Sequence, residues 1–317
     1  MDSLHLVDPE LRPLLELMPT RLFSTETLAE HRAAALAIPV PEGDGVSIET
    51  LTVPGPAGAP DIGLRIYRPG NASGPLPVIY HIHGGGYIAC TTETFDGLNR
   101  PTVAELGCAI VSVEYRLAPE TPFPGAIEDI YAGLAWVYAH AEAQGLDISR
   151  IGVMGESAGG GYAAALALLA RDRGEYRLNF QHLIYPMLDD RTGSGSEPHD
   201  YAGQFVWPVE NNRFGWASLL GKPPGGDDVS PYAAPARATD LRGLPPTFMH
   251  IGALDLFVDE NIDYARRLGR AGVPIEFHIY PGAFHGFENA PDAQIAAQAV
   301  RTSRAALKRF LSPKAAT

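Results

Sequence analysis

The hydrophobic residues of the chain fall into short unbroken runs separated by longer amphipathic stretches. Each run ends at a loop and is followed by a helical pattern; the runs cover residues 78–82, 109–113, 151–154, 182–185, 247–251 and 275–279. Strands that are buried on both faces, as in parallel sheets, show hydrophobic runs without alternation. The pattern therefore predicts the strands of a mostly parallel sheet.

Two earlier segments have a different pattern. Residues 46–53 and 62–67 alternate apolar and polar side chains, and Pro54-Gly55-Pro56 lies between them. Alternation on both sides of a turn predicts an antiparallel pair of strands, here at one edge of the sheet. Together with the hydrophobic runs, this pair predicts an eight-stranded sheet.

Helical patterns fill the intervals between the hydrophobic runs. The predicted helices cover residues 123–143, 157–173, 258–270 and 291–311. Gly145 follows the first of them at a position typical of a helix C-cap. Alternating strands and helices predict an α/β fold with helices on both faces of a doubly wound sheet, which the antiparallel pair makes mixed.

Two stretches do not follow this alternation. Residues 1–45 contain short helical patterns at 9–18 and 25–37, followed by a breaker-rich linker from Pro39 to Gly45. Residues 186–246 show little strand character, and a structureless loop of that length is uncommon in a compact domain unless it serves function. We interpret both stretches as parts of a helical cap; for the N-terminal helices, simple packing on the surface is the alternative. The predicted divisions are residues 1–45 for the N-terminal part of the cap, 46–189 for the first part of the core, 190–225 for the cap insert and 226–317 for the rest of the core.

The strongest chemical motif is Gly155-Glu156-Ser157-Ala158-Gly159, between a hydrophobic run and an Ala-rich helical pattern. A serine in a G-x-S-x-G sequence at a strand-to-helix turn is typical of a nucleophile elbow. Small residues are needed in such a tight turn, and the helix N-terminus favours developing negative charge. We therefore predict that Ser157 is a nucleophile. The alternative is a Gly-rich helix start capped by a serine.

A second motif, His83-Gly84-Gly85-Gly86, follows directly after a hydrophobic run. Consecutive glycines let the backbone approach a substrate and direct N–H groups toward an oxyanion. The sequence is of the H-G-G-G type found in oxyanion loops. We predict that Gly85, Gly86 and Ala158 donate these N–H groups and that His83 is structural rather than a base. A merely flexible glycine loop is the alternative.

A nucleophilic serine needs a base and a residue that orients the base. His285 lies in a Gly-flanked loop after the last predicted strand, and Asp255 follows the strand before it. The order Ser, Asp, His is the one found in hydrolases with a nucleophile elbow, and open α/β sheets place their sites at the carboxyl ends of strands. Asp259 and Glu260 are alternatives for the acid, but they lie in the next predicted helix, whose first turn they would charge.

Together these motifs resemble those of the bacterial hormone-sensitive-lipase-like esterases, also called family IV esterases. The resemblance spans residues 77–287; it rests on His83 to Gly86, Tyr115 to Glu120, Gly155 to Gly160, Asp255 with Asp259-Glu260, and His285-Gly286-Phe287. It implies an α/β-hydrolase fold with a cap over the site, and hydrolysis of carboxylic esters with short to medium acyl chains without a cofactor. It also implies that Tyr115 to Glu120 supports the site structurally.

One position departs from the family pattern. Glu156 precedes the nucleophile, where aspartate is more common in these esterases. The longer side chain is expected to reach different neighbours, with consequences for the pH profile but not for the mechanism. We therefore predict a structural role for Glu156 beside the site.

Aromatic residues gather in the predicted cap insert, and such rings often line apolar pockets. Anchoring of the cap to the sheet is an equally good interpretation of the same residues. The residues predicted to contact the substrate are Phe205, Trp207, Phe214 and Leu256, with Trp216 and Phe257 as further candidates.

The charge and the cysteines limit the classes of partner and compartment. With 37 acidic and 24 basic residues among 317, the net charge of −13 disfavours binding to nucleic acids or anionic membranes. No window reaches the ~20 apolar residues of a membrane span, and the N-terminus does not resemble a secretory signal. Cys90 and Cys108 match no common metal-site spacing and indicate a reducing compartment, although a disulfide between them remains open. We predict a cytoplasmic enzyme with a small-molecule ester substrate and no metal or cofactor; the exposed last strand could pair two copies into a homodimer.

Three other functions fit parts of the pattern. A peptidase or amidase would use the same residues on a different bond, but no extended peptide site is evident. A ligand-binding protein on a hydrolase scaffold would typically lack the histidine that is present here as His285. A lipase acting at oil–water interfaces would need a strongly hydrophobic lid, for which the sequence gives no support.

Overall fold

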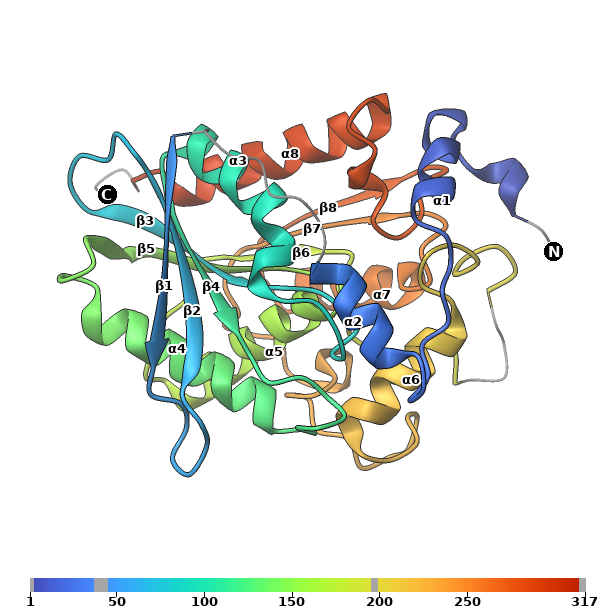
Figure 1. The fold of residues 1–317 in the computed structure, drawn as a ribbon, viewed down its shortest axis with the longest axis horizontal. Helices are drawn as coiled ribbons and strands as arrows, with labels where there is room; N and C mark the ends of the chain where they lie inside the picture. The colour runs from blue at the N-terminus through green and yellow to red at the C-terminus, as the bar shows by residue number, and fades with distance from the viewer. Residues whose placement is uncertain (1–2, 37–44, 195–198, 314–317) are drawn as a thin grey trace.

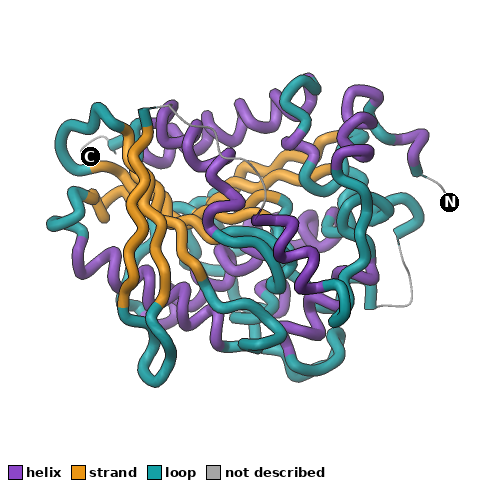
Figure 2. The backbone as a smooth tube through the Cα atoms, viewed as in Figure 1, coloured by secondary structure: helices purple, strands orange, loops and turns teal. Residues whose placement is uncertain are grey.

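The computed structural model describes residues 3–36, 45–194 and 199–313 of the chain. Its eight strands form one sheet in the order β1-β2-β4-β3-β5-β6-β7-β8, which twists strongly from one end to the other (Figures 1 and 2). The strands are β1 (Val46–Val53), β2 (Ile62–Pro69), β3 (Leu76–Ile82), β4 (Ala109–Glu114), β5 (Leu146–Glu156), β6 (Gln181–Ile184), β7 (Thr247–Gly252) and β8 (Ile275–Tyr280).

The antiparallel part of the sheet is confined to one edge. β1 pairs with β2 from Val46 opposite Pro69 to Val53 opposite Ile62, and β2 pairs antiparallel with β4. All the other pairs are parallel. The predicted mixed eight-stranded sheet is therefore confirmed, and the carboxyl ends of the parallel strands meet at one edge, where the site motifs follow them.

Helices cover both faces of the sheet, as predicted. They are α1 (Arg12–Leu17), α2 (Leu28–Leu36), α3 (Asp96–Leu106), α4 (Gly125–His140), α5 (Ala158–Arg173), α6 (Val209–Leu220), α7 (Val258–Arg270) and α8 (Gln294–Leu311). Figure 1 shows α3 and α8 on one face and α4, α5 and α7 on the other. The sequence pattern predicted neither α3 nor α6, whereas the four helices predicted for the core are present with slightly shifted ends.

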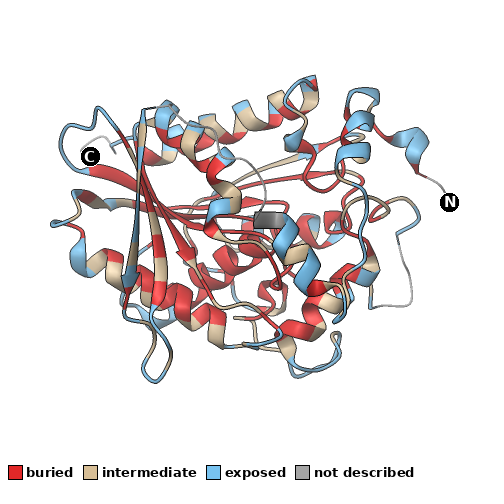
Figure 3. Cartoon of the chain, viewed as in Figure 1, coloured by how far each residue is buried: buried red, intermediate tan, exposed pale blue. Residues whose placement is uncertain are grey.

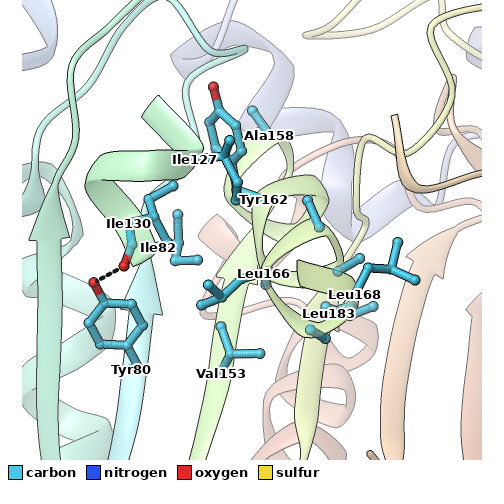
Figure 4. Packing of buried hydrophobic residues seen from close by; sticks show 14 of the residues in the cluster. Tyr80, Ile82, Ile127, Ile130, Val153, Ala158, Tyr162, Leu166, Leu168 and Leu183 are labelled. Atoms are coloured by element: carbon cyan, nitrogen blue, oxygen red, sulfur yellow. Dashed lines mark hydrogen bonds between the residues drawn. The ribbon is translucent and has the colours of Figure 1, made fainter. Parts of the chain in front are cut away.

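The central strands and α5 form the buried core (Figure 3). Every residue of β3 is buried, and so is every residue of α5 from Ala158 to Ala170. On α4, a Cβ at Gly133 would lie 2.3 Å from the Tyr80 hydroxyl oxygen, so only glycine allows the helix to pack this closely. That hydroxyl donates a 2.8 Å hydrogen bond to the Ile130 carbonyl, which fixes α4 on β3 (Figure 4). The rigid core thus holds the strand ends that carry the site.

The N-terminal segment and the region around α6 lie against each other. The Asn211 side chain accepts a 2.9 Å hydrogen bond from the Phe23 N–H and donates one of 2.8 Å to the Arg21 carbonyl. The Thr20 hydroxyl oxygen also accepts the Val206 N–H at 3.0 Å. The two stretches interpreted as cap are therefore in direct contact, although they are far apart in sequence.

Helix α2 is also bonded to the core. The Arg32 guanidinium donates to the carbonyls of Ile88 at 2.7 Å and Ala118 at 2.9 Å, and it pairs with both carboxylate oxygens of Glu120 at 2.8 Å. These contacts join the N-terminal segment to the loop after the consecutive glycines and to the loop that follows β4. The last residue of the predicted 25–37 helix and the linker, apart from Gly45, lie outside the described residues.

The two cysteines are free thiols, so the disulfide left open by the sequence does not form. Burial raises the pKa of Cys90 and of Cys108 to about 12. Within the described ranges, no helix is both long enough and apolar enough to cross a membrane. In the same part of the chain, no three or more His, Cys, Asp or Glu side chains are grouped so that they could hold a metal ion.

Candidate active site

Ser157 lies on the tight turn between β5 and α5. Its backbone has φ 56° and ψ −121°, a conformation that a non-glycine residue adopts only when its surroundings impose it. The neighbouring glycines allow the turn to sit under the strand ends: a Cβ at Gly159 would lie 2.0 Å from the Ile82 carbonyl oxygen, and one at Gly155 would lie 2.2 Å from that of Gly159. The turn thus lifts the serine side chain above the carboxyl edge of the sheet.

The structure brings Ser157, His285 and Asp255 together in a single chain of hydrogen bonds. His285 Nε2 lies 2.9 Å from the Ser157 hydroxyl oxygen, and its Nδ1 lies 2.7 Å from Asp255 Oδ2. The other carboxylate oxygen of Asp255 accepts the Phe257 N–H at 3.0 Å. Asp255 is 1% exposed, so water does not compete with these bonds.

The consecutive glycines form a tight loop beside the serine. Gly85 has φ 117° and Gly86 has φ 61°, both unfavourable for residues with a side chain. A Cβ at Gly85 would lie 2.0 Å from the Ala89 carbonyl oxygen, and one at Gly86 would lie 2.1 Å from the Trp207 ring. A Cβ at Gly84 would lie 3.4 Å from the Ser157 Cβ, so the loop runs directly past the serine.

Comparison with known proteins identifies the fold family. A family model described as "alpha/beta hydrolase fold" matches residues 79–289. The chain belongs to this α/β-hydrolase family. Carboxylesterase NlhH of Mycobacterium tuberculosis is 37% identical over 316 residues, which cover 96% of each chain. Esterase LipI of the same organism is 35% identical over 293 residues, covering 90% of this chain and 89% of the relative.

A solved esterase structure is similar to this hydrolase over nearly its whole length. A bacterial heroin esterase matches with a TM-score of 0.91 and 41% identity, covering 98% of this chain and 100% of the other. These relatives confirm the resemblance to the bacterial hormone-sensitive-lipase-like esterases that the motifs predicted.

His83 is buried in this hydrolase and holds the start of the glycine loop. Its Nδ1 lies 2.8 Å from the Gly84 carbonyl oxygen, and its ring stacks on Tyr115 with 4.2 Å between ring centroids. The Tyr115 hydroxyl donates back to the His83 carbonyl at 2.8 Å. Burial lowers the pKa of His83, which favours a neutral ring. These contacts support a structural role for His83 and for the segment that begins at Tyr115.

The two alternative acids lie elsewhere in the hydrolase. Asp259 is exposed on the first turn of α7. Glu260 is buried, and its carboxylate accepts the Leu188 N–H at 2.6 Å and a hydrogen bond from the Thr192 hydroxyl. Burial raises the pKa of Glu260 well above its ordinary value. Neither carboxylate is hydrogen-bonded to His285, so Glu260 instead anchors the loop that leaves β6.

The predicted substrate-contacting residues divide into two groups. Phe205 lies near the site, with its ring centroid 5.8 Å from that of Phe284, the neighbour of His285. Trp207 packs against the glycine loop, as described above, and Leu256 is buried against Gly203.

Phe214 and Trp216 have other surroundings. Phe214 packs beside a buried group that includes Leu28 and Ile88, and it lines an outer groove of about 690 Å³ together with Arg213 and Lys222. Trp216 is fully buried, with its ring 5.1 Å from that of Tyr87, and therefore anchors α6 to the core. The interpretation of these rings as anchors thus fits Trp216 best.

Two residues beside the site carried no motif in the sequence. Tyr185, the last residue of a predicted strand, places its ring 4.6 Å from that of His285. Burial, together with nearby Glu288, raises the pKa of Tyr185 well above its ordinary value, so the phenol stays neutral. The other is His81 on β3, whose Nε2 lies 2.9 Å from Glu156 Oε2. Neither has a sequence signal beyond its place near a strand end.

Proposed function

We propose that this protein is a serine carboxylesterase that hydrolyses esters with short to medium acyl chains through Ser157, His285 and Asp255. Its enzyme class is carboxylic-ester hydrolase, since relatives at 35–41% identity over most of the chain are named esterases or carboxylesterases. The observation that carries the proposal is the hydrogen-bond chain from the Ser157 hydroxyl through His285 to Asp255.

In this mechanism the Ser157 hydroxyl oxygen attacks the ester carbonyl while His285 Nε2 accepts its proton. The Asp255 carboxylate keeps the proton of the neutral ring on Nδ1 and stabilises the imidazolium that forms. His285 then protonates the departing alcohol, which leaves an acyl group on Ser157. A water molecule, deprotonated by His285, hydrolyses this ester and regenerates the serine.

The oxyanion of the tetrahedral intermediate lies against the N–H groups of Gly85, Gly86 and Ala158 in our proposal. The positive φ values of the two glycines and the contact of Gly84 with Ser157 support it, because they bring this backbone close to the serine. Fixed donors of this kind stabilise the charge that develops in the transition state.

We further propose that the N-terminal segment and the insert between β6 and β7 form a cap over this site, with Phe205, Trp207 and Leu256 next to the acyl or alcohol group. The hydrogen bonds between the two stretches support a joint cap.

The edge strand β8 would pair two copies into a homodimer in our proposal. The two free thiols fit a cytoplasmic enzyme.

Hydrolysis of a p-nitrophenyl ester series from acetate to palmitate tests the proposed substrate class. We expect kcat/KM to be highest between acetate and octanoate and to fall at least ~10-fold by palmitate, because a capped pocket of ordinary size holds only a limited chain. Matched p-nitroanilides should react far more slowly, since an amine is a poorer leaving group. Equal rates on anilides would favour the amidase; no reaction on any substrate would favour the binding protein.

Gly86→Ala tests the oxyanion loop. The new Cβ would overlap the Trp207 ring, so the loop must move, and we expect kcat to fall roughly 100-fold, as for loss of one oxyanion donor. Gly107→Ala is the matched control, because Gly107 has φ 62° and open space around its Cβ position. In a Trp207→Ala background the clash is gone, and adding Gly86→Ala should cost less than ~10-fold. An equal cost in both backgrounds would contradict this explanation.

A further inference from the structure

Glu156 and His81 form a buried pair between the two strands that lead into the site. In the sheet register His81 lies opposite Met154, and Glu156 follows two residues later on the same face of β5. Glu156 Oε2 lies 2.9 Å from His81 Nε2, and the side chains are 3% and 0% exposed. In the part of the chain that the structure describes, His81 is the one hydrogen-bond partner of this carboxylate.

The opposite side of the His81 ring is held by two other elements. Its Nδ1 lies 2.7 Å from the Ser112 hydroxyl oxygen on β4, the register partner of His81, and 3.2 Å from the Asn99 amide nitrogen on α3. An amide nitrogen can only donate, so Nδ1 accepts and the ring proton is on Nε2. His81 therefore donates to Glu156, and the ring orientation is fixed from both sides.

This pair lies directly beneath the reacting groups. Glu156 is followed by Ser157, and β3 continues past His81 into the glycine loop. The two strand ends also touch farther on, because a Cβ at Gly84 would lie 2.8 Å from the Glu156 carbonyl oxygen. A sliding of β5 against β3 would thus change the distance between the Ser157 hydroxyl and the donors of the loop.

We propose that Glu156 and His81 are positioning residues that set the spacing between the nucleophile turn and the oxyanion loop. What matters is the length of the Glu156 side chain, which lets it reach His81, rather than its charge. Aspartate, the residue that the resemblance to family IV esterases leads one to expect here, is shorter by one carbon–carbon bond, about 1.5 Å, so its carboxylate would not reach His81 within hydrogen-bond distance. Glutamine has the length of glutamate, and its amide oxygen can accept the same bond. The proposal rests on the esterase function proposed above.

Comparison of Glu156→Asp with Glu156→Gln tests the proposal. We expect Glu156→Asp to lower kcat on p-nitrophenyl butyrate about 10-fold with little change in KM, since a displaced reacting group costs rate rather than binding. Glu156→Gln should retain kcat to within about threefold because its reach is kept. Rates are expressed per active site titrated with a fluorophosphonate, so unfolded protein does not contribute. Ser112→Ala, which removes one support of the His81 ring, should lower kcat in the same direction by a smaller factor.

The outcomes separate the possible roles. If Glu156→Gln loses activity and shifts the pH–rate profile while Glu156→Asp keeps both, the charge is what matters and the proposal is wrong. Equal activity in all variants, or equal loss in both Glu156 variants, also overturns it. If Glu156→Asp does not fold, unchanged kcat in Ser112→Ala decides against the proposal. An inactive wild type that fails to react with the fluorophosphonate would instead refute the proposed function itself.

Discussion

Ser157→Ala is expected to lower kcat on p-nitrophenyl butyrate by at least ~10⁴-fold, because the acyl-enzyme can no longer form. Substrate binding should change little, since the hydroxyl is small and Ser157 is 8% exposed within a turn that alanine can also occupy. The variant should also fail to react with a fluorophosphonate, which forms its bond with the serine oxygen. Stopped-flow and steady-state rates of the purified proteins measure the first effect, and mass spectrometry measures the second.

Ser149→Ala provides the matched control for this substitution. Ser149 is exposed at the opposite end of β5 from the site, and its hydroxyl contacts only the local Asp147 carboxylate among the described side chains. We expect wild-type rates and full labelling for this variant. Comparable rates for wild type and Ser157→Ala would mean that another residue is the nucleophile.

The strand segments and the main site motifs could be predicted because both are local in sequence. A parallel strand that is buried on both faces is a hydrophobic run, and the turn at Ser157 needs small residues within two positions on either side. Five consecutive residues are therefore enough to predict that sharp turn. The position of His285 and Asp255 near Ser157 could be predicted because the carboxyl ends of parallel strands lie at one edge of the sheet.

Helices α3 and α6 were not predicted because their inward faces carry polar side chains. Asp96, Asn99 and Thr102 of α3 are buried, and so are Asn211 and Asn212 of α6. A search for hydrophobic residues at helical spacing misses such faces, because they are held by hydrogen bonds rather than by apolar contacts. Buried polar groups are usually paired, and the partners of Asp96, Asn99 and Asn211 lie on other elements: β2, β3 and the N-terminal segment.

The same reason explains why the pair of Glu156 and His81 was not predicted. The resemblance to family IV esterases marks Glu156 as a departure from the commoner aspartate, but its partner lies 75 positions away on another strand. Only the register of β3 against β5 places the two side chains on one face. In the sequence His81 looks like an interruption of a hydrophobic run, and a single strand carries no information about its register.

Asp255→Asn is expected to lower kcat by about 10⁴-fold, the effect typical of a triad aspartate whose charge is removed. The structure gives a specific reason. One carboxylate oxygen of Asp255 accepts the Phe257 N–H, so the asparagine amide will turn its oxygen there and its NH₂ toward His285. The Nδ1 atom of His285 must then accept a hydrogen bond, so the proton of the neutral ring is on Nε2. A protonated Nε2 cannot accept the proton of the Ser157 hydroxyl.

Asp259→Asn is the matched control, since Asp259 lies four residues away, is exposed and has the same side chain. We expect its rates to stay within about twofold of wild type, as for most surface substitutions. At high pH, Asp255→Asn should recover part of its activity, because hydroxide can remove the Nε2 proton or that of the serine directly. Loss of activity in Asp259→Asn as large as in Asp255→Asn would mean that the acid is assigned to the wrong residue. Activity of Asp255→Asn within tenfold of wild type at pH 7 would mean that His285 keeps its tautomer without a carboxylate, and that the chain of hydrogen bonds does not carry the mechanism.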